Sequence, residues 1–226
     1  EGSMEPVRTF LLAVYSSIIV RVSLQDSDTR YARIVKEISK DNVTKSFLQR
    51  LDSMTNALVE MPANHQIESN VIRTDARLVP QIENNSVNLI VTSPPYLNAY
   101  DYHKYHRQRL HLIRGDIEFA RKKEIGSHDE FTKKDATPNK YFQDMASCLE
   151  EWKRVLVSKG RCLVLVGDAI VNKAPVNVAD TLVDIGLEIG FQLEERWIRS
   201  VKGTRRSFNV KNSRMSHEHG LVFVKK

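Results

Sequence analysis

The chain has 226 residues, 41% of them hydrophobic, a length and composition that suit one good-sized domain. It contains no run of 18 or more apolar residues, so the sequence predicts a soluble protein without a membrane partner. The formal net charge of +6 favours a polyanionic partner, although many basic proteins never bind nucleic acid.

The predicted elements change in character along the chain. Residues 1–4 look like a cloning remnant, and helices are predicted at 8–22 and 43–60. The elements after Pro62 are a strand at 69–74, a strand at 87–91, a helix at 140–156, a strand at 161–166, a helix at 177–189 that closes at Gly190, and an antiparallel pair at 191–201 and 220–225. We therefore predict an N-terminal helical segment, 5–66, followed by an α/β domain, 67–226.

The predicted strand at 87–91 ends in an unusual motif. Its residues are mostly Val, Leu and Ile, which is typical of a parallel strand buried on both faces. Ser93-Pro94-Pro95-Tyr96 follows, at the position where open α/β sheets bind ligands. A simple Pro-Pro turn, with Tyr96 as a rim aromatic, is the alternative without function.

These residue types suit chemistry on the exocyclic amino group of a base. Its nitrogen is a poor nucleophile, because its lone pair is delocalised into the ring, so an enzyme must accept hydrogen bonds from both N–H groups. Two prolines would aim the Pro94 carbonyl rigidly, and the Ser93 hydroxyl can supply the second acceptor. Tyr96 can stack on the base, which must be flipped out of a duplex or already single-stranded.

At this motif the chain resembles the amino-methyltransferases of DNA, whose signature is Asp, Asn or Ser followed by Pro-Pro-Tyr or Pro-Pro-Phe. The Ser form is most similar to the N4-cytosine enzymes of bacterial restriction-modification systems. Segments 25–31, 98–102 and 218–225 also resemble that family. The resemblance implies a partial class I, Rossmann-like sheet with an antiparallel final strand pair, and catalytic roles for Ser93, Pro94, Pro95 and Tyr96. It also implies a prokaryotic, cytoplasmic and nucleoid-associated protein.

The same resemblance implies S-adenosylmethionine as methyl donor, but the donor side is incomplete. The family grips the donor with a Gly-rich turn, whereas the nine glycines here are scattered and form no Gly-x-Gly. The family comparison thus predicts a sheet that lacks its middle strands, and a chain that is inactive alone. A second polypeptide or an upstream N-terminal half would carry the Gly-rich motif, unless that motif has been lost.

The resemblance implies that three residues of this chain contact the methyl donor, namely Asp75, Ala76 and Thr92. Asp75 could equally cap the turn before Leu78. The family segment around Arg30 suggests no mechanism, and a helix-capping turn that holds Arg30 against a carboxylate would explain it.

Basic residues gather in two segments. Between positions 196 and 214 lie seven Lys and Arg residues and no acid, and the predicted phosphate contacts among them are Lys202, Arg205, Arg206, Lys211 and Arg214. Near the motif, the resemblance implies that Tyr102, Lys104 and Arg107 shape the approach of the target base. The alternative for the 196–214 segment is a solvated loop without a DNA contact. The alternative for Tyr102 is that it packs inward.

The remaining signals limit the chemistry. Cys148 and Cys162 are expected to be buried reduced thiols, and the His residues show no ligand spacing, so we predict no metal. A non-catalytic DNA-binding or scaffold subunit is the alternative to an enzyme, and the intact motif favours the enzyme. Adenine N6 or RNA methylation also stays open beside cytosine N4.

Overall fold

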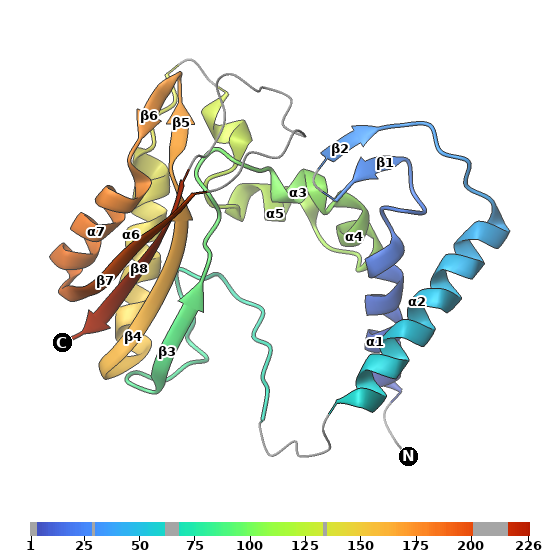
Figure 1. Ribbon diagram of the computed structural model, residues 1–226, viewed down its shortest axis with the longest axis horizontal. Helices are drawn as coiled ribbons and strands as arrows, with labels where there is room; N and C mark the ends of the chain where they lie inside the picture. The colour runs from blue at the N-terminus through green and yellow to red at the C-terminus, as the bar shows by residue number, and fades with distance from the viewer. Residues whose placement is uncertain (1–3, 29, 62–67, 133–134, 201–216) are drawn as a thin grey trace. The chain divides into compact units, whose positions relative to one another are not determined.

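The computed structural model describes residues 4–28, 30–61, 68–132, 135–200 and 217–226, and Figure 1 labels their helices and strands. The chain divides into two compact units. The first contains Glu1–Asn70 and Tyr102–Lys122, and the second contains Val71–Asp101 and Lys123–Lys226. Residues 102–122 thus pack with the N-terminal segment although they follow the motif in the sequence.

The first unit is mainly helical. Its elements are α1 (Glu5–Ile18), β1 (Gln25–Ser27), β2 (Arg30–Arg33), α2 (Lys40–Glu60), α3 (Tyr102–Tyr105), α4 (Arg107–Leu112) and most of α5 (Ile117–Lys123). The predictions of the two long helices are confirmed. The Ser39 side chain caps α2 by accepting from the N–H of Asn42 at 3.1 Å. Although α2 packs on α1, none of its 21 residues is buried, so it contributes little to a core.

The family segment around Arg30 forms a β-hairpin, so the predicted helix-capping turn is wrong. Strands β1 and β2 pair antiparallel, and Arg30 bonds to Asp26 at 2.9 Å. The carboxylate pairing of Arg30 is therefore found, but within a hairpin. Asp28 accepts from Arg109 of α4 at 2.6 Å, which attaches the hairpin to the helices of this unit.

The second unit is built on a four-stranded mixed sheet with the order β3-β4-β8-β7. The strands are β3 (Val87–Thr92), β4 (Leu156–Gly167), β7 (Phe191–Ser200) and β8 (His217–Lys225), and β5 (Ala169–Val171) and β6 (Ala174–Val176) form a separate hairpin. Strand β3 is parallel to β4, whereas β8 is antiparallel to both β4 and β7. The predicted α/β fold with an antiparallel final strand pair is confirmed.

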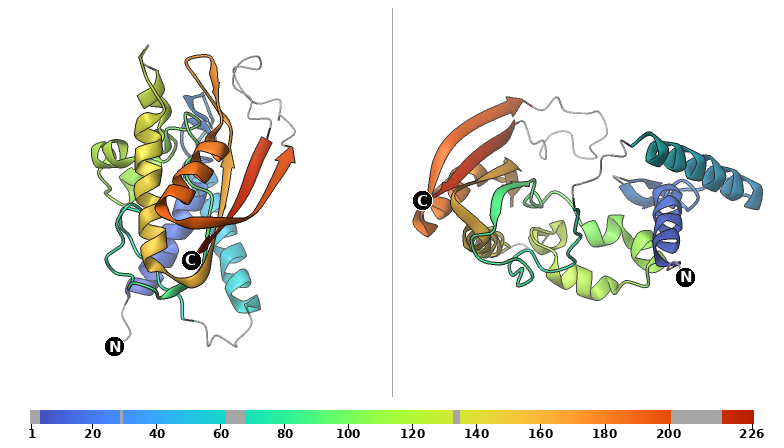
Figure 2. Two further views of the ribbon diagram at one scale, coloured as in Figure 1. Left: turned by 90° about the vertical axis from the view of Figure 1, so that its left-hand side faces the viewer. Right: turned by 90° about the horizontal axis from the view of Figure 1, so that it is seen from below.

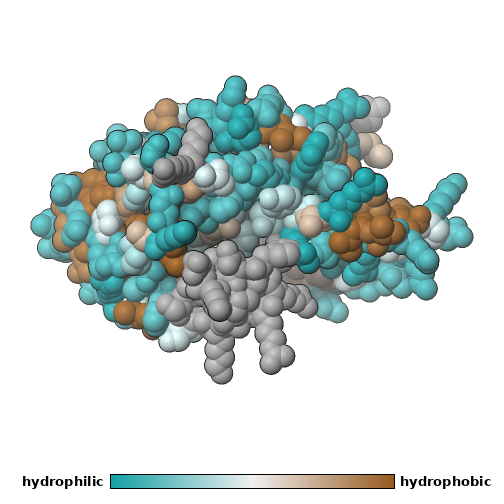
Figure 3. Space-filling model, turned by 90° about the horizontal axis from the view of Figure 1, so that it is seen from above, coloured by the Kyte–Doolittle hydropathy of each residue, from teal (hydrophilic) through white to brown (hydrophobic). Residues whose placement is uncertain are grey.

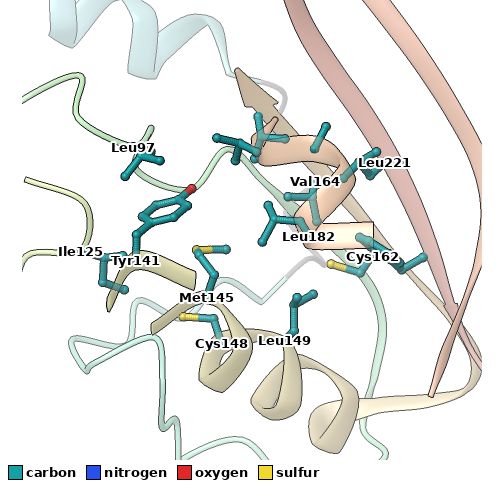
Figure 4. Packing of buried hydrophobic residues seen from close by; sticks show 14 of the residues in the cluster. Leu97, Ile125, Tyr141, Met145, Cys148, Leu149, Cys162, Val164, Leu182 and Leu221 are labelled. Carbon is teal, nitrogen blue, oxygen red and sulfur yellow. The ribbon is translucent and has the colours of Figure 1, made fainter. Parts of the chain in front are cut away.

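Helices α6 (Asn139–Val155) and α7 (Val178–Ile189) cover one face of this sheet, and a short 3₁₀ helix, η1 (His128–Phe131), precedes α6 (Figure 2). Figure 4 shows buried side chains between the helices and the strands, and Met145 and Leu149 of α6 belong to the same cluster as Cys162 of β4. Helix α7 ends as predicted at Gly190, whose φ of 96° is the left-handed conformation that glycine favours.

Three predictions about the sheet are wrong. Residues 69–74 form no strand, and Val71 is fully exposed, because no described strand lies beside this run to bury it. Strand β3 is not buried on both faces: Leu89 and Val91 are 57% and 62% exposed, because they lie on the face opposite the one that α6 and α7 cover. The expected gap in the middle of the sheet is absent, because the four strands are contiguous neighbours.

The face seen in Figure 3 is largely hydrophilic, with separate hydrophobic patches. Among the described residues, no helix combines the length and the hydrophobicity that a membrane span requires. Cys148 and Cys162 are buried and free, as predicted. Burial raises the pKa of both thiols to about 12, so neither is a nucleophile at neutral pH.

The packing of α7 on β8 depends on Gly186. A Cβ at this position would lie 2.6 Å from the ring of Phe223, which is fully buried and cannot move aside. We expect Gly186→Ala to lower the free energy of unfolding by about 1–3 kcal/mol, measured by urea denaturation. In an exposed helix the same change stabilises by up to about 1 kcal/mol, so a stabilised variant would contradict this packing. Glu188→Ala, on an exposed position of α7, is the control.

Candidate active site

The Ser93-Pro94-Pro95-Tyr96 motif directly follows β3, at the carboxyl end of the strand. Ser93 is exposed, Pro94 is buried, and Pro95 and Tyr96 are half-buried. The N–H of Ala99 donates to the carbonyl of Tyr96 at 3.2 Å, so the chain turns immediately after the motif. The structure thus brings a serine side chain and an aromatic ring together at the sheet edge where ligands bind.

Tyr141 of α6 holds the motif from the core. Its hydroxyl donates to the carbonyl oxygen of Pro95 at 3.1 Å, and burial of its side chain raises the pKa of Tyr141, so it stays a neutral donor. Gly126 allows this close approach, because a Cβ there would lie 2.8 Å from the tyrosine ring. No sequence signal marked Tyr141, because a tyrosine in an amphipathic helix is an ordinary core residue.

The loop after the motif is anchored by two polar side chains. The amide nitrogen of Asn98 donates to the carbonyl of Ile170 at 2.7 Å, and its amide oxygen lies 2.6 Å from Nδ1 of His128. Asp101 is buried and accepts from the Ser127 hydroxyl at 2.6 Å. Both residues belong to the family-like segment 98–102, and their contacts give that segment a positioning role.

Glu218 of β8 holds the motif from the sheet side. The Tyr96 hydroxyl donates to Oε1 of Glu218 at 3.0 Å, and the Ser93 hydroxyl donates to the Tyr96 hydroxyl at 3.4 Å. Arg199 of β7 donates from Nε to Oε2 of Glu218 at 3.0 Å and also from a terminal guanidinium nitrogen. The Arg199 hydrogen bond lowers the pKa of Glu218, and burial raises the pKa of Tyr96. A glutamate and a phenol hydroxyl therefore meet at the motif, one ionised and one neutral at pH 7.

Of the predicted donor contacts, Asp75 has protein partners of its own. Thr92 ends β3 beside Ser93, whereas Asp75 lies in a turn where its two oxygens accept from the Arg77 guanidinium at 2.9 and 2.7 Å. Arg77 also bonds to Asp144 of α6 at 2.6 Å, and its hydrogen bond lowers the pKa of Asp75. Asp75 thus has the structural role that the sequence left as the alternative. The donor contacts of Asp75, Ala76 and Thr92 stay a prediction.

The predicted nucleic-acid contacts are only partly visible. Tyr102 and Lys104 lie in α3, where Tyr102 stacks on His106 and the Lys104 ammonium lies 5.6 Å from the centre of the Tyr31 ring. Arg107 begins α4. Lys202, Arg205, Arg206, Lys211 and Arg214 fall outside the described residues, between β7 and β8. Helix α3 belongs to the first unit and the motif to the second.

The family model for DNA methylases of the N6/N4 type matches residues 87–226, which include the motif and every strand of the sheet. The chain belongs to this DNA methylase family. The match begins at β3 and runs through β8, so the contacts of Tyr141 and Glu218 with the motif both lie inside the DNA methylase region. No match was found among curated proteins.

Solved methyltransferases have similar structures at low identity. A protein assigned as a DNA modification methylase from Thermus thermophilus, in complex with S-adenosyl-L-methionine, is 19% identical over 67% of this chain and 53% of its own, with a TM-score of 0.42. The PvuII DNA methyltransferase, described as cytosine-N4-specific, is 17% identical over 69% and 48%, with a TM-score of 0.44. A SAM-dependent methyltransferase from Methanosarcina mazei is 10% identical over 76% of each chain, with a TM-score of 0.37. This DNA methylase chain spans about half the length of the Thermus and PvuII proteins.

Proposed function

We propose that this DNA methylase transfers a methyl group from S-adenosylmethionine to the exocyclic amino group of a flipped DNA base, as the base-side half of a split or truncated enzyme. Cytosine N4 is the proposed target, in a prokaryotic restriction-modification system. The observation that carries the proposal is the motif itself, which follows β3 and is held by Tyr141 on one side and Glu218 on the other.

The motif residues have distinct roles in this reaction. The Ser93 hydroxyl and the Pro94 carbonyl accept from the two amino N–H groups, which makes the nitrogen a better nucleophile, and Tyr96 stacks on the base. When the new nitrogen–carbon bond forms, the amino group loses one proton to solvent water, which can reach the exposed Ser93 end of the motif. No covalent enzyme intermediate is needed. The cysteine thiols Cys148 and Cys162 are buried away from such a role.

The donor must be held largely by residues outside those described. S-adenosylmethionine supplies an electrophilic methyl group: the sulfur–carbon bond breaks with its electron pair on sulfur, so no oxidant or reductant is required. Asp75 is already paired with Arg77, and the sequence has no Gly-x-Gly turn. A second polypeptide, or another part of the natural protein, is therefore proposed to carry the Gly-rich donor turn.

The open side of the sheet supports such a complement. Among the described strands, β3 pairs only with β4, so its outer edge can accept a further strand. Register places Leu89 and Val91 of β3 on the same face as Leu163 of β4 and Val222 of β8, opposite the face that α6 and α7 cover. Leu89 and Val91 are more than half exposed, so a complement that pairs with β3 would also gain apolar surface to bury.

The basic segment between β7 and β8 is proposed to contact DNA phosphates. Neutralising Arg205 and Arg206 together should lower the slope of log affinity against log salt by about 1.8, because each phosphate contact contributes about 0.9 for duplex DNA. Fluorescence anisotropy with labelled duplex DNA at several salt concentrations measures that slope. An unchanged slope would remove these residues from the phosphate contacts.

The function is tested by identifying the methylated nucleoside. DNA and RNA from cells that express the chain with its neighbouring genes are digested and analysed by mass spectrometry, with Ser93→Ala as the matched control. N4-methylcytosine in the DNA that disappears in the control is the expected result. Detection of N6-methyladenine or of a modified RNA nucleoside would replace cytosine N4 as the proposed target. No modified nucleoside in either sample would favour the alternative, a non-catalytic DNA-binding subunit.

A further inference from the structure

A short chain of hydrogen bonds leads from the motif into the sheet. The Ser93 hydroxyl donates to the Tyr96 hydroxyl, which donates to Glu218, which in turn is held by Arg199. We propose that Glu218 and Arg199 are positioning residues for methyl transfer, which fix the Tyr96 hydroxyl so that Ser93 presents lone pairs to the amino group of the target base. This inference rests on the proposed function.

The sheet topology brings Glu218 to the motif. Glu218 lies opposite Gly167 at the carboxyl end of β4 and opposite Arg199 near the end of β7. Because β8 is antiparallel to β4, its first residues lie at the same sheet edge as the carboxyl end of β3. The contact spans 122 residues of sequence, so it is a product of the fold.

Each oxygen of the Glu218 carboxylate has a separate partner. Oε1 accepts from Tyr96 and Oε2 accepts from Arg199, while the glutamate side chain is only 12% exposed. A carboxylate with so little exposure needs such partners to remain ionised. Arg199 lowers the pKa of Glu218, so the group is a strong hydrogen-bond acceptor and a poor destination for a proton. Its role is orientation rather than general base catalysis.

The orientation has a direct consequence at Ser93. A hydroxyl can donate one hydrogen bond and accept two, so a serine that donates to Tyr96 keeps both lone pairs for acceptance. Without that partner the hydroxyl could turn its proton toward the base, where it would repel the amino hydrogens. The distance of 3.4 Å between the two hydroxyl oxygens is long, and such contacts commonly shorten when substrate binds.

The Arg199 and Glu218 pair differs from an ion pair with a purely structural role. An exposed ion pair across two strands adds little stability, and Arg161 with Glu194 provides one on the same sheet, with Nε of Arg161 2.6 Å from Oε2 of Glu194. The Arg199 and Glu218 pair differs because Glu218 also binds the motif tyrosine. Glu194→Ala is therefore a matched control, an ion-pair carboxylate of the same sheet without a motif contact.

The test is a double-mutant cycle in methyl-transfer kinetics. The protein is purified from cells that express it with its neighbouring genes, and unmodified genomic DNA is the substrate. Tyr96→Phe keeps the ring but removes the hydroxyl, and Glu218→Ala removes its acceptor. Each is expected to lower kcat about tenfold, the effect of one lost hydrogen bond, with KM for DNA changed less than about threefold. The double variant should be no slower than the slower single variant.

Conservative rescue separates positioning from folding. Glu218→Gln keeps an oxygen for the Tyr96 hydroxyl and should restore kcat to within about threefold of the wild type. Glu194→Ala should leave kcat unchanged. The inference would be overturned if the kcat losses of the two single variants multiplied in the double variant, or if Glu218→Ala had the wild-type kcat. Either result would leave the proposed function in place. A wild-type protein that transfers no methyl group in any preparation would overturn the proposed function and the inference together.

Discussion

Replacing Ser93 with Ala is expected to lower methyl transfer by about a hundredfold to a thousandfold, the usual cost of removing one preorganised group that binds the reacting centre. Ser93 is exposed at the end of β3 and belongs to no core contact, so the variant should fold normally. DNA affinity should change less than about threefold, because phosphate contacts supply most of the binding free energy. Labelled methyl transfer and DNA anisotropy measure the two quantities on the same preparation.

Two further variants are compared with Ser93→Ala. Ser158 is an exposed serine near the start of β4, so Ser158→Ala should leave both methyl transfer and DNA affinity unchanged. Tyr96→Ala removes the stacking ring and should cost about 1–3 kcal/mol in transition-state binding, again with little change in DNA affinity. A large loss of DNA affinity in Ser93→Ala or Tyr96→Ala would mean that the motif binds DNA as a structural element and has no special role in catalysis.

Replacing Leu89 with Lys is expected to abolish the activity of the completed enzyme. Leu89 is 57% exposed in this chain, so the variant should alter its own stability by no more than about 0.5 kcal/mol. If a complement covers the open face of β3, the variant buries an unpaired ammonium group, which costs several kcal/mol and prevents assembly. Size-exclusion chromatography of the chain with its complement, together with labelled methyl transfer, measures the loss.

Leu187→Lys is the control for the open face. Leu187 is 49% exposed on α7, and the same substitution there should leave assembly and activity unchanged. Loss of assembly in both variants would indicate that added charge, rather than the face of β3, is responsible. Normal assembly of Leu89→Lys would show that a complement, if present, leaves this face uncovered.

Much of the second unit could be predicted from local patterns. The helix that contains Met145 and Leu149 shows a 3.6-residue period, and the strand before Ser93 is rich in Val, Leu and Ile, so the helix follows from its apolar period and the strand from β propensity. The motif was also recognised from four adjacent residues, because its chemistry depends on neighbours in the sequence. Such features are encoded within one turn or one strand.

The features that could not be predicted depend on contacts between distant segments. The 69–74 run has the composition of a strand, yet Val71 is fully exposed, because a strand also needs a neighbour. Leu89 also has the composition of a core residue, but its burial depends on a neighbouring element that the local sequence does not reveal. The contact of Tyr96 with Glu218 joins residues far apart in sequence, and so does the contact of Arg77, the partner of Asp75, with Asp144 of α6.

The most direct test is methyl transfer from labelled S-adenosylmethionine to DNA, by the purified chain alone and after addition of the polypeptide encoded beside it. If the motif is the base-side half of an active site, label enters DNA only in the mixture, and Ser93→Ala in this chain removes it. Label that enters DNA with the chain alone would contradict the need for a separate donor-binding part. Label in neither sample, with both polypeptides folded and assembled, would contradict the enzymatic function.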